Sequence, residues 1–182
     1  PLRKWGQEGG FKPTPVYTKG QFFGMPRQRR SGAEGTLSPQ PQVRRFDGRR
    51  VLLDSLLGED YALIGWGVDP SAYLSQTSKQ ILTQVGCRLV TLYAYGQRPQ
   101  GQTSRDLNPQ VQEVEDIEGF MVDWFKQACL SETGIALIRP DKFTFAAVTP
   151  QGINAAIAQL KQQLAMDQIV ANSTPASTGA AV

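Results

Sequence analysis

The sequence predicts an α/β fold in which one mixed sheet lies between helices. Short apolar runs of strand length alternate with longer segments whose apolar residues repeat at helical spacing. Glycine or proline separates most of these runs. They form a strand-helix-strand half, a helix-bearing crossover, and a strand-strand-helix half. This order is the thioredoxin-like arrangement, and we expect it to occupy residues 36–168.

The length and hydropathy of the chain limit the classes of protein to consider. With 182 residues it can bury one ordinary core and carry extensions beside it. No apolar run approaches the roughly 18 residues that a membrane-spanning helix requires, so we expect no membrane partner. The segment after Pro1 lacks the apolar stretch of a signal peptide, and we therefore expect a cytoplasmic protein.

The chain contains two cysteines, Cys87 and Cys129, and no histidine. The lack of histidine excludes the Ser-His-Asp and Cys-His catalytic arrangements and most structural zinc sites. Two cysteines this far apart give no disulfide framework. We expect them to be buried structural thiols in a reducing compartment.

The first half of the predicted sheet contains an edge strand and a central strand. Residues 43–46 follow two prolines and precede an Asp47-Gly48 turn, which favours an edge strand. Residues 52–57 predict one or two helical turns closed by Gly58. The apolar run 61–66 is typical of a strand buried on both faces.

The middle of the chain supplies the next helix, strand and crossover. Residues 75–86 begin with a serine cap, end at a glycine and predict a helix. Residues 89–95 predict a second central strand, and a polar loop follows. Four acidic residues within 113–118 precede apolar residues at helical spacing up to 128. We interpret them as the acidic start of a helix, because they lack the ligand spacing of a calcium loop.

The C-terminal half predicts a hairpin followed by a helix. Residues 134–139 and 143–148 are expected to pair antiparallel around the Arg139-Pro140-Asp141 turn, with Arg139 free to pair with a carboxylate. Apolar spacing predicts an amphipathic helix over 153–164. The small-residue tail 169–182 has no reason to fold and is expected to be disordered.

Charge is distributed unevenly along the chain. Residues 1–50 carry eleven Lys and Arg against three acids, a net +8, whereas residues 51–182 carry a net −5. Glycines and prolines make residues 1–35 an irregular, extended basic arm. One interpretation is nucleic-acid binding. The favoured one is an arm complementary to an acidic protein surface, since the aromatic residues near it lack the spacing of an RNA-binding motif.

The corner after the first central strand is where a thioredoxin-type enzyme holds its thiolate. Here the corner reads Gly65-Trp66-Gly67 and contains no cysteine, so dithiol chemistry is not expected. No Gly-x-Gly-x-x-Gly follows a strand, and Trp66 and Trp124 are interpreted as packing anchors. The residues alone therefore predict a redox-inactive thioredoxin-like binding module, with no catalytic, cofactor-binding or metal-binding residue assigned.

Five segments, in order, resemble the C-terminal part of the flavin-dependent aromatic hydroxylases, the phenol hydroxylase-like family. They are residues 11–17 (FKPTPVY), 35–43 (GTLSPQPQV), 52–58 (LLDSLLG), 61–67 (YALIGWG) and 138–143 (IRPDKF). The Gly-Trp-Gly sequence and Phe143 favour the branch that acts on 3-(3-hydroxyphenyl)propanoate over phenol hydroxylase. The likeness extends over about residues 11–165.

This resemblance implies a parent monooxygenase that uses FAD and NADH to hydroxylate a phenolic substrate, such as 3-(3-hydroxyphenyl)propanoate, ortho to its hydroxyl group. The family's cofactor and substrate sites lie upstream of the matched region, so no catalytic or cofactor-binding residue is carried over. The chain would then be a non-catalytic C-terminal domain, and residues 1–35 would be the linker from the missing FAD and substrate domains. Those domains and a second subunit are the implied partners, and nucleic acid is not.

Overall fold

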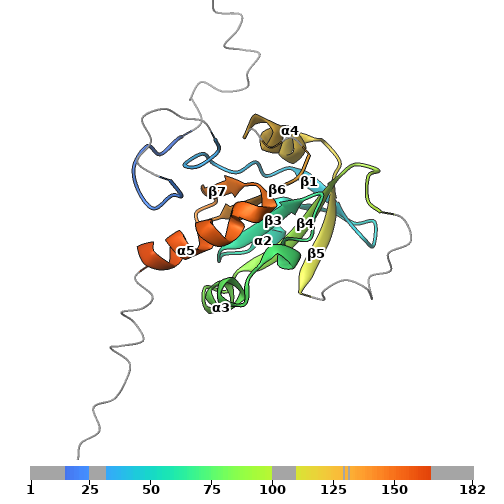
Figure 1. Cartoon of the computed structure of the whole chain (residues 1–182). Coiled ribbons are helices and arrows are strands. Elements are labelled where there is room, and N and C mark those ends of the chain that lie inside the picture. The colour runs from blue at the N-terminus through green and yellow to red at the C-terminus, as the bar shows by residue number, and fades with distance from the viewer. Residues whose placement is uncertain (1–14, 25–31, 100–109, 129, 131, 165–182) are drawn as a thin grey trace, which may run out of the picture.

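A seven-stranded mixed sheet forms the centre of the molecule, and helices cover both of its faces (Figure 1). The computed structural model describes residues 15–24, 32–99, 110–128, 130 and 132–164. The strand order is β2-β1-β5-β4-β3-β6-β7. The predicted class, a mixed sheet between helices, is confirmed.

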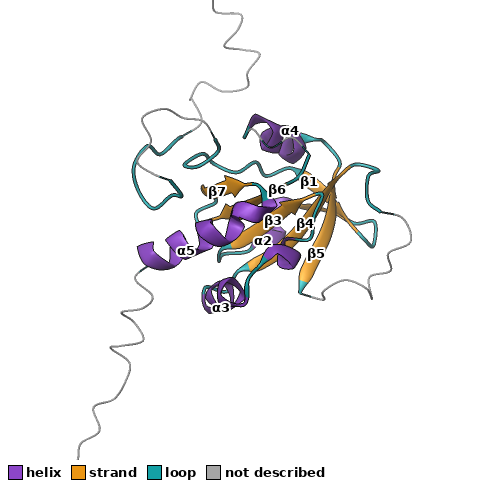
Figure 2. Cartoon of the chain, in the orientation of Figure 1, coloured by secondary structure: helices purple, strands orange, loops and turns teal. Residues whose placement is uncertain are grey.

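The elements follow one another along the chain as predicted, with two additional strands (Figure 2). The strands are β1 (Gln42–Arg45), β2 (Arg50–Leu52), β3 (Ala62–Trp66), β4 (Arg88–Ala94), β5 (Val111–Asp116), β6 (Gly134–Ile138) and β7 (Thr144–Val148). The helices are α2 (Leu53–Leu57), α3 (Gln76–Gln84), α4 (Phe120–Gln127) and α5 (Ile153–Gln163), with short 3-10 turns η1 (Pro70–Tyr73) and η2 (Pro150–Gly152).

The sheet separates two hydrophobic cores, as the alternation of side chains along each strand requires. Ile64 of β3 belongs to the core under α2 and α4, together with Leu92 and Phe125. Its neighbour Leu63 belongs to the core under α3 and α5, together with Phe145. β3 is paired on both sides, parallel to β4 and antiparallel to β6, and all five of its residues are buried.

The acidic stretch predicted to start a helix is instead a strand. Residues 113–116 lie in β5, which pairs parallel to β4 and antiparallel to β1, and α4 begins only at Phe120. The prediction failed because the carboxylates are neutralised by partners from elsewhere in the chain. Asp116 alone has the expected role: its carboxylate accepts hydrogen bonds from the backbone N–H groups of Met121 and Val122 at the start of α4.

The strand predicted at the edge of the sheet is not at the edge. β1 lies between β2 and β5, and the three-residue β2 forms the edge. The expected turn at Gly48 is present, with φ of 81° and a hydrogen bond from its N–H group to the Arg45 carbonyl. β2 was missed because it runs directly into α2 and is too short to show a periodicity of its own.

Residues 15–24, which we call the N-terminal strap, lie against β7 and α5 of this same chain (Figure 1). Phe22 is buried, with 1% of its surface exposed, and the Phe23 N–H group donates to the Phe145 carbonyl at 2.9 Å. The predicted division into arm, domain and tail remains a prediction, because residues 1–14, 25–31 and 165–182 lie outside the described residues.

Candidate functional site

The corner at the end of β3 is shaped by a tight reversal of the chain. A Cβ atom on Gly65 would lie 2.2 Å from the Val68 carbonyl oxygen, so only glycine fits there. Gly67 follows with φ of 69°, and its N–H group donates to the Leu92 carbonyl at 2.9 Å. The turn is thus held by its own close backbone packing and by a hydrogen bond to β4.

The side chain at this corner is a packing anchor, as predicted. Trp66 is only 7% exposed and stacks on Phe125 of α4, with 5.6 Å between the ring centroids. Trp124 meets the same Phe125 edge to face at 5.0 Å. These contacts hold α4 to the sheet and leave the indole of Trp66 unavailable for stacking on a ligand.

The corner does not fit the dinucleotide part of FAD. Such a cofactor needs free backbone N–H groups at the start of a helix, directed at its pyrophosphate. The turn after β3 leads instead into the four-residue η1, where the Asp69 carboxylate accepts a hydrogen bond from the Ser71 N–H group at 2.7 Å. A carboxylate in that position repels a phosphate group, so this corner is unsuited to the pyrophosphate of FAD.

Cys87, directly before β4, is a free thiol that is partly buried. Burial, and to a smaller extent the nearby Asp60, raise its pKa to about 12. A thiol that stays protonated at neutral pH is a poor nucleophile and a poor metal ligand. This fits the predicted structural role, whereas Cys129 lies outside the described residues.

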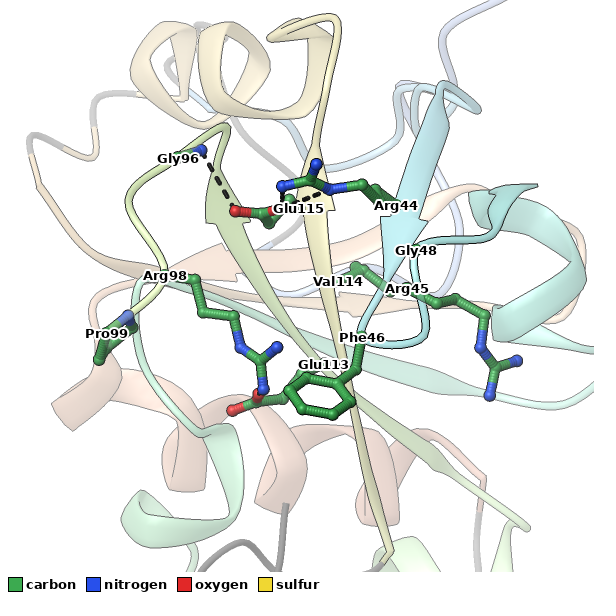
Figure 3. A pocket seen from close by; sticks show the side chains of 10 residues that line it. All are labelled: Arg44, Arg45, Phe46, Gly48, Gly96, Arg98, Pro99, Glu113, Val114 and Glu115. Carbon is green, nitrogen blue, oxygen red and sulfur yellow. Dashed lines mark hydrogen bonds and ion pairs between the residues drawn. The ribbon is translucent and has the colours of Figure 1, made fainter. Parts of the chain in front are cut away.

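A pocket of about 530 Å³ opens where β1, β5 and the end of β4 meet (Figure 3). Its walls carry three arginines, two glutamates and an exposed phenylalanine. Glu113 and Glu115 alternate with the core residue Val114, so they lie on the sheet face that α3 and α5 cover farther along. The core under those helices includes no residue of β1 or β5, so the pocket lies on the part of that face without a helix.

The upper part of the pocket in Figure 3 is built around Glu115. Its carboxylate accepts hydrogen bonds from Nε, at 2.8 Å, and Nη2 of Arg44, which lies directly across the β1–β5 ladder. The other carboxylate oxygen accepts from the Gly96 N–H group at 3.2 Å. The Arg44 guanidinium also lies 5.0 Å from the centre of the Tyr95 ring, within cation–π range. Hydrogen bonding to Glu115 raises the pKa of Arg44, so its guanidinium group stays protonated.

The lower part repeats the same arrangement two residues earlier on β5. Glu113 forms an ion pair with Arg98, whose guanidinium lies 4.2 Å from the centre of the Phe46 ring. The Tyr93 hydroxyl donates to the other oxygen of Glu113 at 3.3 Å. Burial first, and then Glu113, raise the pKa of Tyr93 to about 12, so this hydroxyl is neutral at physiological pH.

The pocket therefore presents arginines fixed between carboxylates and aromatic rings. Each glutamate forms an ion pair with an arginine, and the Tyr93 hydroxyl keeps its proton, so these groups are not arranged for nucleophilic or acid–base catalysis. Arginine and aromatic side chains held in one geometry are suited to recognition. We call Arg44, Phe46, Tyr95 and Arg98, with Glu113 and Glu115 beneath them, the arginine–aromatic patch.

Sequence reasoning missed this patch, although one signal was present. Glu113 and Glu115 stand on either side of Val114, an alternation with the period of a half-buried strand that is too short to distinguish a strand from the acidic start of a helix. The predicted turn at Arg139 is confirmed: Arg139 pairs with Asp141 at 2.8 Å and donates to the Gln21 carbonyl of the strap at 3.1 Å. The absence of catalytic, cofactor-binding and metal-binding residues remains a prediction.

Two findings concern the described part of the chain only. Within residues 15–24, 32–99, 110–128, 130 and 132–164, no helix is long and apolar enough to cross a membrane. The same residues contain no group of three Cys, Asp or Glu side chains arranged to hold a metal ion.

The fold and the corner define the chain as a thioredoxin-like domain built without a thiol at the usual position. Comparison with known proteins gives its family. Residues 35–163 match the HcaD C-terminal domain, and the chain belongs to that family.

Two relatives that align with most of the chain are hydroxylases. A 3-(3-hydroxy-phenyl)propionate/3-hydroxycinnamic acid hydroxylase of Klebsiella pneumoniae subsp. pneumoniae is 30% identical over 168 residues, covering 91% of this chain and 29% of the relative. A second such hydroxylase, of Burkholderia vietnamiensis, is 33% identical over 147 residues, covering 79% of this chain and 26% of the relative. The chain thus spans less than a third of the length of these relatives.

Three solved structures illustrate the similar fold. The flavin-dependent monooxygenase PieE aligns over 84% of this chain and 25% of its own, with a TM-score of 0.53 and 14% identity. Aklavinone-11 hydroxylase aligns over 84% of this chain and 26% of its own, with a TM-score of 0.51 and 16% identity. Copper-bound ScoI of Arabidopsis thaliana aligns over 70% of this chain and 99% of its own, with a TM-score of 0.50 and 12% identity. At these identities the likeness shows the fold alone.

Proposed function

We propose that this chain is the C-terminal, non-catalytic domain of an FAD- and NADH-dependent monooxygenase. The parent enzyme hydroxylates a phenolic acid such as 3-(3-hydroxyphenyl)propanoate ortho to its hydroxyl group. The domain packs on the FAD and substrate domains and takes part in subunit assembly. We place the parent enzyme in the cytoplasm, where NADH is available to it.

One observation carries this proposal: the alignment with a hydroxylase relative covers 91% of this chain but only 29% of the relative. The part of the relative that it matches is therefore a minor one, which leaves most of the enzyme to hold the cofactor. The corner after β3, with Asp69 across the start of η1, supports a site for FAD elsewhere. In the arginine–aromatic patch each glutamate is paired with an arginine, which supports a role in contacts rather than chemistry.

The test begins with the full-length protein, produced from the complete reading frame that contains this sequence. We expect it to be purified yellow, to retain FAD after desalting, and to oxidise NADH faster when 3-(3-hydroxyphenyl)propanoate is added. Mass spectrometry of the product should show one added oxygen atom. A colourless protein that gains no FAD on incubation would contradict the proposal.

The 182-residue chain alone is the matched sample. We expect it to retain no flavin absorbance after incubation with FAD and desalting, and retention would place a cofactor site within it. A salt-dependent gel shift of this chain with DNA or RNA would instead favour the redox-inactive binding module with a basic arm. If the chain gives such a shift and the full-length protein binds no FAD, the proposed function is wrong and nucleic-acid binding takes its place.

A further inference from the structure

We propose that the arginine–aromatic patch is the surface on which the preceding part of the same polypeptide docks, through a face that carries carboxylates around an apolar centre. This inference rests on the proposed function, because it takes its occupant from the parent enzyme. It adds the location of the contact and the chemistry of the partner face.

Exposed aromatic rings are the first reason to regard the patch as a contact surface. Phe46 and Tyr95 are each 60% exposed, and each lies beside an arginine that is itself fixed by a glutamate. Arginine and aromatic residues are enriched at protein interfaces, where held side chains lose little entropy on binding. The patch therefore has both the composition and the rigidity of a docking surface.

The charges of the patch indicate the partner's chemistry. The carboxylates lie underneath and the guanidinium groups above: the Glu115 side chain is 10% exposed and that of Arg44 is 38% exposed. The β1–β2 hairpin adds Arg45, which lines the same pocket, and the exposed Arg50. The surface that a partner meets is thus cationic and aromatic, and carboxylates opposite it are the complementary groups.

The strap sets the distance that the preceding polypeptide must cover. It binds at the β7 edge, whereas the patch lies near the β2 edge. Seven strands at about 4.8 Å spacing put these edges roughly 29 Å apart. The fourteen residues before Pro15 can span at most roughly 50 Å, so a domain attached through them can reach the patch of its own chain.

The experiment uses the full-length protein with a specific protease site inserted immediately before Pro1. After cleavage, we expect the two parts of the otherwise wild-type protein to elute together from a size-exclusion column at low salt. Salt at 0.5 M should weaken the association, because screening shortens the range of the charge pairs. The F46A/Y95A double variant and R45E should each raise the dissociation constant about tenfold or more.

Phe120→Ala is the matched control, because Phe120 is a similarly exposed phenylalanine, at 58%, on α4. It should leave the dissociation constant within about twofold of wild type, as expected for a residue outside an interface. Far-UV circular dichroism of each variant verifies that the domain stays folded. Unchanged association in F46A/Y95A and R45E would overturn the proposal.

A second copy of the chain is the competing occupant. If F46A/Y95A converts an intact oligomer to a monomer in light scattering while the cleaved parts stay associated, the patch is a subunit interface and the proposal is wrong. FAD retention by the uncleaved protein is measured separately. Failure of the uncleaved wild-type protein to retain FAD would refute the proposed function. The association of the cleaved parts is measured without flavin and tests the docking surface alone.

Discussion

The two edges of the sheet are finished in opposite ways. At the β7 edge, backbone groups are paired by an added segment: Gly35 donates to the Thr144 carbonyl at 3.0 Å, and Thr144 donates to the Thr36 carbonyl at 2.9 Å. At the other edge, the three-residue β2 carries no covering segment among the described residues, and it begins at Arg50, directly after Arg49. Pairing and charge are both ways of protecting a sheet edge, but only charge leaves the neighbouring surface open to a partner.

The aromatic residues at the two edges differ in the same way. Phe22 is buried below Arg139, and its carbonyl accepts hydrogen bonds from Gln159 and Gln163 of α5. Phe46 lies beside Arg98 with most of its ring in solvent. The same pairing of arginine with phenylalanine therefore seals the domain at one edge and presents a surface at the other.

The largest effect that we predict is on Phe22. Phe22→Ala should lower the free energy of unfolding by about 3–5 kcal/mol, because it removes a fully buried ring and leaves a cavity under the strap. Phe46→Ala, the same change at the exposed site, should cost less than about 0.5 kcal/mol. Urea denaturation of both variants measures the difference. Similar losses in the two variants would contradict the contrast between the edges.

Glu115 should show the next largest effect. Glu115→Gln keeps the shape of the side chain but removes the charge that Arg44 and the Gly96 N–H group face. We expect a loss of about 1–2 kcal/mol in the free energy of unfolding, as for a buried hydrogen bond to a charged group. Glu118→Gln, at an exposed position of the same acidic stretch, should change it by less than about 0.5 kcal/mol. An equal effect at both positions would mean that the patch is not held in place by its carboxylates.

A pH-dependent effect is expected from Tyr93. Its pKa is about 12 in the folded protein and 10 in the unfolded chain, so the folded state keeps the proton longer. The stability that this provides is complete below pH 10 and is lost as the pH rises from 10 toward 12. At pH 11 the loss is about 1 kcal/mol. Comparing wild type with Tyr93→Phe by urea denaturation at pH 9 and pH 11 isolates it, and identical pH dependence in both would refute it.

The fold was predictable where the pattern that specifies it is local. β3, α3, the β6–β7 hairpin and α5 each show their own periodicity, caps and turn residues within a few positions. β5 does not, because its glutamates fit a strand only when arginines neutralise them. Arg44 and Glu115 lie 71 residues apart in sequence, and their pairing exists only once β1 is placed beside β5.

The patch was unpredictable for the same reason. Its residues come from β1 and the turn after it, from the loop after β4 and from β5, and only the sheet order brings them together. The corner after β3 was read correctly because all of its determinants lie within residues 65–70: two glycines, a buried tryptophan and no cysteine.

The smallest effect is expected from Asp47, at the tip of the β1–β2 hairpin. Hydrogen bonds from Arg49 lower the pKa of Asp47, but both side chains are largely exposed and water screens the pair. Any contribution to stability is present above the usual aspartate pKa and is lost as the pH falls through the lowered one. Asp47→Asn should therefore leave the midpoint of thermal unfolding at pH 7 within about 1 °C of wild type. A larger shift would mean that surface charges stabilise the β2 edge, as backbone pairing stabilises the β7 edge.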